Sequence, residues 1–145
     1  TQIIFLGSGN TFVGDIRSTG SSTSYNTSSD YRLKENVTPI SDGITRLKTL
    51  KPSRFNFKVD KDTTVDGFLA HEVTAVPEAV SGTKDEVVTQ AMIDNGDAPS
   101  DSKLNDPIYQ QIDQAKLVPL LTAALQEAVA KIETLESKVA TLEGS

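Results

Sequence analysis

The most regular hydrophobic pattern lies in the last third of the chain. From residue 118 onward, hydrophobic residues recur at alternating steps of three and four, which is the heptad spacing of a coiled-coil helix. The a positions are Val118, Leu125, Ile132 and Val139, and the d positions are Leu121, Ala128, Leu135 and Leu142. We therefore predict one long helix over residues 114–143, with Pro119 near its start, where a missing backbone donor costs least.

Charged residues flank this heptad pattern in a regular way. Lys131 and Lys138 occupy g positions, and Glu136 and Glu143 occupy e positions, so g-to-e pairs would form between parallel chains. The helix is therefore predicted to form a parallel homo-oligomer, and its mixed a positions leave two and three strands open. The alternative is a single amphipathic helix that packs on its own domain.

Two shorter elements are predicted ahead of that helix. Hydrophobic residues at helical spacing over residues 40–50, behind Ser41 and Asp42 as N-cap residues, predict a short amphipathic helix. Alternating residues over 54–59 and a second hydrophobic run over 65–70 predict a β-hairpin.

The segment between the hairpin and the long helix has weaker signals. Residues 71–80 indicate a helical turn interrupted at Pro77, and the hydrophobic residues within 87–93 indicate another strand. Residues 84–113 hold seven acidic residues against two basic ones, together with glycine and proline, so part of them is predicted to be an exposed, mobile excursion. The elements together predict an α+β fold: a small mixed module that ends in a long C-terminal helix.

The first 29 residues have a different composition. They contain only two charged residues, and 12 of the 29 are serine or threonine. Hydrophobic runs at 3–6 and 11–14 predict two short strands across a turn, and the Ser/Gly-rich residues 18–24 predict a flexible linker. Because an isolated hairpin is marginally stable in water, we expect this segment to be the end of a larger strand-rich structure.

Composition and charge narrow the classes of function. A chain of 145 residues suits one domain with appendages, and a net charge of −6 disfavours non-specific binding to nucleic acid or to an anionic membrane. No cysteine and one histidine exclude thiolate and multi-histidine metal sites. No hydrophobic run is long enough to span a bilayer, and no basic signal-peptide region opens the chain. We expect a soluble piece of a longer protein with no cofactor and no metal, and with protein as its partner.

A candidate nucleophile lies where the composition changes. Without cysteine, the simplest arrangement left is a serine hydroxyl activated by a lysine amine, provided that burial or a neighbouring cation favours the neutral amine. Ser29 and Lys34 are five residues apart at this boundary, and Arg32 is a candidate cationic neighbour. A serine and a lysine at this spacing are common by chance, so Ser29-Asp30 acting only as a helix cap remains an alternative.

The sequence around this pair resembles a known family. Residues 26–37, Asn-Thr-Ser-Ser-Asp-Tyr-Arg-Leu-Lys-Glu-Asn-Val, contain the Ser-Asp-x-Arg-x-Lys pattern of the C-terminal intramolecular chaperone of phage tailspikes and tail fibres. This self-cleaving domain also follows endosialidases and occurs inside the myelin regulatory factor of animals. Residues 67–73 are similar to the family's Gly-Phe-Ile-Ala-Gln-Glu-Val, with His71 in place of glutamine, and residues 116–127 are similar to its closing helix.

The resemblance implies a role for each part of the chain. Residues 30–145 would be a chaperone that ends in a parallel trimeric coiled coil, holds three fibre chains together and is then cut away. Residues 1–29 would be the β-rich end of the trimeric fibre shaft, which is the folding client. The resemblance also implies assembly in the cytoplasm of a bacterial host, with the shaft remaining on the virion tail.

The resemblance further assigns site residues. Ser29 matches the essential serine and Lys34 its lysine partner, with cleavage between Ser29 and Asp30 by a single-turnover serine peptidase activity. Asp30, Arg32 and Glu72 are candidate supporting residues.

The chemistry of this cut is not straightforward. Attack by the Ser29 hydroxyl on its own carbonyl would close a strained four-membered ring, whereas attack on the preceding carbonyl passes through a five-membered ring. Two other routes stay open: the Ser29 and Lys34 pair acts between protomers of the trimer, or the Asp30 carboxylate attacks the Ser29 carbonyl through a six-membered ring. The alternative function is a structural trimerisation and receptor-binding tip that is never cut.

Overall fold

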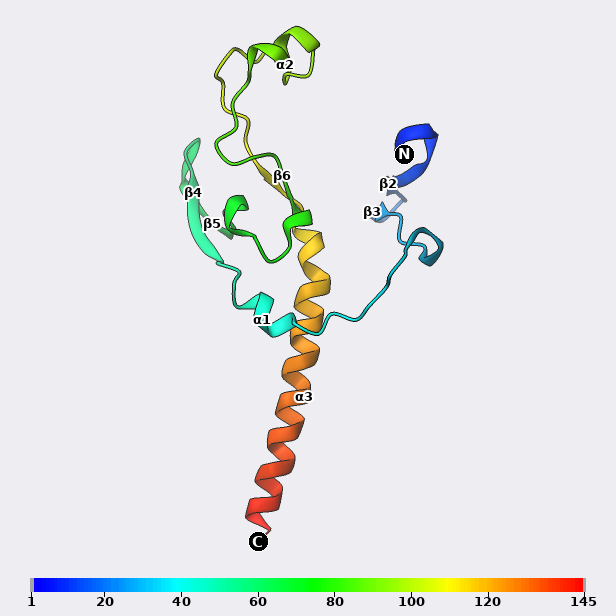
Figure 1. Cartoon of the computed structure of the whole chain (residues 1–145), viewed down its shortest axis with the longest axis vertical. Helices are drawn as coiled ribbons and strands as arrows, with labels where there is room; N and C mark the ends of the chain where they lie inside the picture. The colour runs from blue at the N-terminus through cyan, green and yellow to red at the C-terminus, as the bar shows by residue number, and fades with distance from the viewer. Residues whose placement is uncertain (1, 145) are drawn as a thin grey trace. The chain divides into compact units, whose positions relative to one another are not determined.

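Residues 2–144 are described in the computed structural model of the chain, which is shown in Figure 1. The predicted α+β class is confirmed, because antiparallel strands, short helices and one long C-terminal helix are all present. The chain divides into two compact units, residues 1–39 and 40–145. The predicted domain boundary after residue 29 falls inside the first unit and stays a prediction. Residues 1 and 145, the outer ends of the two predicted domains, lie outside the described residues.

The first unit is built around a three-stranded antiparallel sheet in the order β1-β2-β3. Its strands are β1 (Gln2–Leu6), β2 (Phe12–Ser18) and β3 (Thr23–Thr27). The predicted hairpin of the first two strands is confirmed. The flexible linker predicted over residues 18–24 is wrong, because these residues close a second hairpin. The Thr19 hydroxyl accepts hydrogen bonds from the backbone N–H groups of Ser21 (3.4 Å) and Ser22 (3.2 Å), so the hydroxyl-rich composition stabilises a turn.

This sheet has almost no core of its own. Among the described residues of the first unit, only Gly14 and Asp15 are buried. Ile3 and Ile4 point to opposite faces, because neighbouring residues alternate along a strand, and both side chains are exposed. A sheet with hydrophobic residues exposed on both faces needs further protein to cover them.

The buried charge of this sheet is the carboxylate of Asp15. It accepts hydrogen bonds from the side chains of Gln2 in β1 (2.8 Å), Arg17 in β2 (2.5 Å) and Asn26 in β3 (2.7 Å). These bonds, that from Asn26 most of all, lower the pKa of Asp15 below its ordinary value against the opposing effect of burial. One ionised group therefore ties the three strands together.

The second unit begins with a short helix and a hairpin, both in their predicted places. These elements are α1 (Gly43–Leu47), β4 (Ser53–Phe57) and β5 (Asp60–Gly67). The two strands pair antiparallel, with Arg54 opposite Asp66. Two 3-10 turns follow at Ala70–Glu72 and Pro77–Ala79, which agrees with the predicted helical segment interrupted at Pro77.

A long excursion follows between two short paired strands, β6 (Val80–Ser81) and β7 (Gln111–Ile112), and carries α2 (Gln90–Asn95) at its far end (Figure 1). Most of its residues are exposed, as predicted.

The strand predicted over residues 87–93 is wrong, because most of this segment is helical. The Thr89 hydroxyl accepts from the backbone N–H of Met92 (3.3 Å) and so caps α2 (Gln90–Asn95). Gly96 ends the helix with a φ of 76°, a conformation that glycine adopts without strain. The capping residues at both ends decide in favour of a helix here.

The hydrophobic core of the second unit lies where the start of the long helix meets the turns after β5. Its buried residues are Leu50, Val73, Val76, Ala79, Leu117 and Leu120. Phe68 is partly buried and packs against this cluster. Two residues of the Gly-Phe-Leu-Ala-His-Glu-Val segment, Phe68 and Val73, therefore serve the core.

The predicted C-terminal helix is confirmed as α3 (Val118–Glu143), which follows a 3-10 turn at Gln114–Leu117. Pro119 lies in its first turn, as predicted. The second half of α3 extends beyond the other elements of its unit (Figure 1), and residues 129–143 are exposed throughout.

The helix α3 packs on its own unit with a face that differs from the heptad face. Leu120, Ala123 and Ala124 are buried, and α1 lies against this part of the helix. The large residues of the heptad pattern are all exposed: Val118, Leu121, Leu125, Ile132, Leu135, Val139 and Leu142. The first part of α3 therefore packs on its own domain, as the alternative predicts, but through a face other than the heptad face.

Candidate functional site

The two residues predicted as the catalytic pair are in contact. The Lys34 Nζ donates a hydrogen bond to the Ser29 Oγ at 2.8 Å, and both side chains are exposed. An extended chain would separate residues five apart by about 17 Å, so the backbone between them has to fold back.

A single 3-10 turn, Tyr31–Leu33, makes this reversal. Asp30 caps the turn, with its Oδ1 accepting from the backbone N–H of Arg32 at 2.9 Å. The backbone N–H groups of Leu33 and Lys34 donate to the carbonyl oxygens of Asp30 and Tyr31, both at 3.1 Å. The residues that follow Ser29 therefore build the turn that returns Lys34 to it.

The guanidinium of Arg32 also binds the Asp30 carboxylate. Its Nε donates to Oδ1 at 2.9 Å and its Nη2 donates to Oδ2 at 2.7 Å, which is the two-bond geometry of strong arginine–carboxylate pairs. Hydrogen bonds from the side chain and then the backbone of Arg32 lower the pKa of Asp30 below its ordinary value of 3.8, and the charge of Lys34 adds to this. The same pair raises the pKa of Arg32.

The residue before Ser29 is held by the sheet. The backbone N–H of Ser28 donates to the carbonyl oxygen of Val13 at 2.9 Å, and the Ser28 hydroxyl donates to the carbonyl oxygen of Phe12 at 3.2 Å. Ser29 therefore lies between a residue anchored on β2 and a residue anchored in the turn.

A serine hydroxyl and a lysine amine in contact are the two groups that a serine–lysine dyad requires. As an ammonium, Lys34 donates to the hydroxyl; to act as a base, the amine must lose its proton and accept the hydroxyl proton instead. The contact supplies the geometry for that transfer, and burial or a nearby cation would favour the neutral amine.

The other predicted supporting residue, Glu72, belongs to the second unit. Its Oε1 accepts from the Lys51 Nζ at 3.0 Å, which links the turn after β5 to the segment that precedes β4. His71 beside it is exposed. The contacts of Glu72 are thus those of a structural ion pair.

Sequence reasoning missed the structural role of Glu127. Its Oε1 accepts from the backbone N–H of Gly43 at 2.5 Å and its Oε2 from that of Ile44 at 3.1 Å, so α3 caps the start of α1. Asp42, predicted as an N-cap residue, occupies that position but makes no side-chain capping bond. The sequence does carry a signal for this role: Glu127 lies on the same helix face as the buried residues Leu120 and Ala124.

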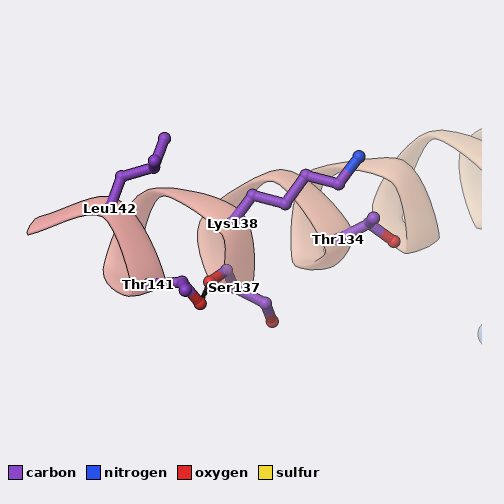
Figure 2. Close-up of a pocket in the computed structure, with 5 residues that line it drawn as sticks. All are labelled: Thr134, Ser137, Lys138, Thr141 and Leu142. Atoms are coloured by element: carbon purple, nitrogen blue, oxygen red, sulfur yellow. Dashed lines mark hydrogen bonds between the residues drawn. The ribbon is translucent and has the colours of Figure 1, made fainter. Parts of the chain in front are cut away.

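A shallow hollow lies along the free end of α3, lined by Thr134, Ser137, Lys138, Thr141 and Leu142 (Figure 2). The Thr141 hydroxyl donates to the Ser137 carbonyl oxygen at 2.9 Å, and the hydroxyls of Thr134 and Ser137 bond back to their own helix in the same way. This surface belongs to one helix, and its hydroxyls are satisfied locally.

Residues 2–144 were searched for metal sites and for membrane-spanning helices, and neither was found. In this part of the chain, no group of three or more histidine, cysteine, aspartate or glutamate residues is placed to hold a metal ion. Nor does any helix within it have the length and hydrophobicity to cross a bilayer.

The comparison with protein families matches residues 29–81 to the family described as chaperone of endosialidase. No curated protein matches the chain. The family match begins at Ser29 itself and includes Lys34 and the Gly-Phe-Leu-Ala-His-Glu-Val segment. The predicted recognition is thus confirmed over these residues: the segment that carries Ser29, Lys34 and Glu72 matches the chaperone of endosialidase family.

Proposed function

We propose that this chain is an intramolecular chaperone that assembles three tail-fibre or tailspike chains and then releases itself by one self-cleavage between Ser29 and Asp30. The family of residues 29–81 supports the chaperone role and a fibre or tailspike client. In this proposal residues 1–29 belong to the shaft and residues 30–145 to the removable chaperone. Assembly takes place in the cytoplasm of a bacterial host, and the shaft remains on the virion tail.

The exposed heptad face of α3 supports the oligomer, with other copies of the same chain as its occupant. The face that covers the core is hydrophobic at Leu120 and Ala124, but further along the helix it turns polar at Thr134 and Thr141. The heptad face stays hydrophobic along the whole helix. This difference is expected if the core-facing side of α3 contacts its own unit only along the first half of the helix, whereas the heptad face contacts partner helices along its whole length.

The charges beside the heptad face fit partner helices that run parallel. Lys131 and Lys138 at g positions would meet Glu136 and Glu143 at the e positions of a neighbouring copy.

The sheet of the first unit supports the folding role. Its strands expose hydrophobic residues on both faces, so a single chain cannot bury them. Pairing such strands from three separate chains is slow and exposes them to aggregation. A trimer already formed by α3 raises the effective concentration of the three strand segments for one another.

The observation that carries the self-cleavage is the 2.8 Å hydrogen bond between Lys34 Nζ and Ser29 Oγ at the junction of the two proposed parts. The net reaction is hydrolysis: water adds across the Ser29–Asp30 peptide bond and leaves a carboxylate on Ser29 and an amine on Asp30. Both residues of the pair are exposed in the single chain. Burial of the amine in the assembled trimer would favour its neutral form and make the cut depend on assembly.

Mass spectrometry under denaturing conditions tests the cut, and native mass spectrometry of the same samples gives the oligomer. Wild-type protein should separate into fragments 1–29 and 30–145, whereas Ser29→Ala and Lys34→Ala should remain whole trimers. Lys48→Ala is a control that should be cut normally. Cutting of the Ser29→Ala variant would contradict the proposal.

The exposure of the pair favours a second candidate, a structural trimerisation and receptor-binding tip that is never cut. A wild-type trimer that stays whole, even when more of the upstream shaft is included, would favour this function.

A further inference from the structure

We infer that Arg32 is a positioning residue of the self-cleaving site: it binds the Asp30 carboxylate, fixes the turn that holds Lys34 against Ser29, and keeps that carboxylate away from the Ser29 carbonyl. This inference rests on the proposed self-cleavage. It also selects among the chemical routes, because it removes Asp30 as the nucleophile.

The first step of the inference is that one residue supplies three of the bonds at the turn. Arg32 donates its backbone N–H, its Nε and its Nη2 to Asp30, at 2.9, 2.9 and 2.7 Å. The turn itself contains two long backbone bonds, each of 3.1 Å, from Leu33 and Lys34. An exposed turn of this length has little intrinsic stability, so the contacts with Arg32 are a main reason why it is populated.

The second step is that the turn sets the geometry of the pair. Lys34 is the residue immediately after the turn, and its backbone N–H donates to the carbonyl oxygen of Tyr31. If the turn opens, the backbone of Lys34 is no longer fixed relative to Ser29, and its flexible side chain no longer holds the 2.8 Å contact with the Ser29 hydroxyl. A displacement of about 1 Å at a reacting pair is enough to slow a reaction by up to about 100-fold.

The third step concerns the Asp30 carboxylate as a nucleophile. Both of its oxygens accept hydrogen bonds, Oδ1 from two groups of Arg32 and Oδ2 from the third. Attack on the Ser29 carbonyl would require the carboxylate to leave the guanidinium and the backbone N–H together. The charge of Lys34 also lowers the pKa of Asp30.

The hairpin of the second unit supplies a matched control. Arg54 binds Asp66 through Nε at 2.7 Å and Nη2 at 3.0 Å, again on an exposed surface. That pair crosses two strands that are already joined by backbone bonds, so its loss should leave the junction unchanged.

The experiment uses the whole chain and two measurements. The first is the rate of the Ser29–Asp30 cut in Arg32→Ala, Arg32→Lys, Asp30→Asn and Arg54→Ala. We expect Arg32→Ala to lower the rate by about 10- to 100-fold. Arg32→Lys should retain part of the rate, since lysine supplies the positive charge but not the two parallel hydrogen bonds of the guanidinium. Asp30→Asn should lower it only as far as Arg32→Ala does, and Arg54→Ala should leave it unchanged.

The second measurement does not depend on the cut. Amide hydrogen exchange of Leu33 and Lys34 is followed by NMR in a Ser29→Ala background, which keeps the chain whole. Arg32→Ala should speed exchange at both amides several-fold, and combining it with Asp30→Asn should add little, because the two residues act as one pair. If the wild-type chain is not cut, even when more of the upstream shaft is included, the proposed self-cleavage fails, and the exchange rates alone decide whether Arg32 holds the turn.

Two results would overturn the inference. One is unchanged exchange of Leu33 and Lys34 in Arg32→Ala. The other is a cut abolished by Asp30→Asn but preserved in Arg32→Ala, which would make the Asp30 carboxylate the nucleophile.

Discussion

Truncation of Leu135 to alanine distinguishes a helix that works alone from one that works in a trimer. In the single chain Leu135 is 59% exposed, whereas Leu120 on the core-facing side of α3 is 2% exposed. A lone helix would therefore lose almost nothing from Leu135→Ala, but a coiled coil would lose a buried d-position contact in each chain.

The size of the loss follows from the exposed fraction. Complete burial of a leucine side chain is worth about 1.5–3 kcal/mol, so covering the 59% that remains exposed is worth about 1–2 kcal/mol for each chain. Three chains together make about 3–5 kcal/mol for the trimer, which raises its dissociation constant by between about 100-fold and several-thousand-fold.

Sedimentation equilibrium over a dilution series measures this constant, in a Ser29→Ala background that keeps all chains whole. Thr134→Ala, on the polar side of the same helix, is the control and should leave the constant unchanged. Leu120→Ala should cost about 2–5 kcal/mol of folding stability whether or not chains associate. If the Leu135→Ala and Thr134→Ala variants have the same dissociation constant, the heptad face is not the interface.

Three further predictions concern folding stability. A methyl group added at Gly43 would lie 2.5 Å from the backbone nitrogen of Ala124, so Gly43→Ala should cost about 1–3 kcal/mol in urea unfolding. Gly20→Ala, with no atom within 4 Å of the new methyl group, should cost far less, and equal losses would contradict this close packing. Glu127→Gln keeps the shape but removes the charge that caps α1, and should cost about 1 kcal/mol, with faster amide exchange at Gly43; unchanged exchange would show that the cap is not needed. Because hydrogen bonds depress the pKa of Asp15, its stabilising effect is complete above the ordinary aspartate pKa of 3.8 and is lost as the pH falls through the lower folded value. Acid titration of the sheet's NMR signals should therefore show loss of structure that Asp15→Asn makes less dependent on pH; equal pH dependence in both proteins would refute it.

Elements with a repeated hydrophobic pattern were predictable from the sequence. The long helix, the short helix before it and two hairpins all lie where hydrophobic spacing placed them. The contact between Ser29 and Lys34 agrees with the predicted pairing of these residues, which lie close in sequence and are brought together by a single turn; their catalytic role stays a prediction.

Elements fixed by polar side chains were harder to predict. The strand β3 was missed because its residues, Thr23–Thr27, look like a linker until Thr19 closes the turn before them. Helix α2 was read as a strand because its hydrophobic residues are few and its two caps decide its structure. The bond between Glu127 and α1 joins residues 84 apart in the sequence, and local patterns carry no information on such a pair.

If three chains assemble as proposed, the exposed second half of α3 has a consequence for the order of assembly. Residues 129–143 are exposed throughout, and a helical segment of this length is marginally stable by itself in water. If association supplies its stability, helix formation in this segment and trimer formation become one concerted step, with a population that rises steeply with chain concentration. Such a step would act as a threshold: dilute chains would keep their ends frayed and unpaired, and strand pairing would begin only after three chains had met.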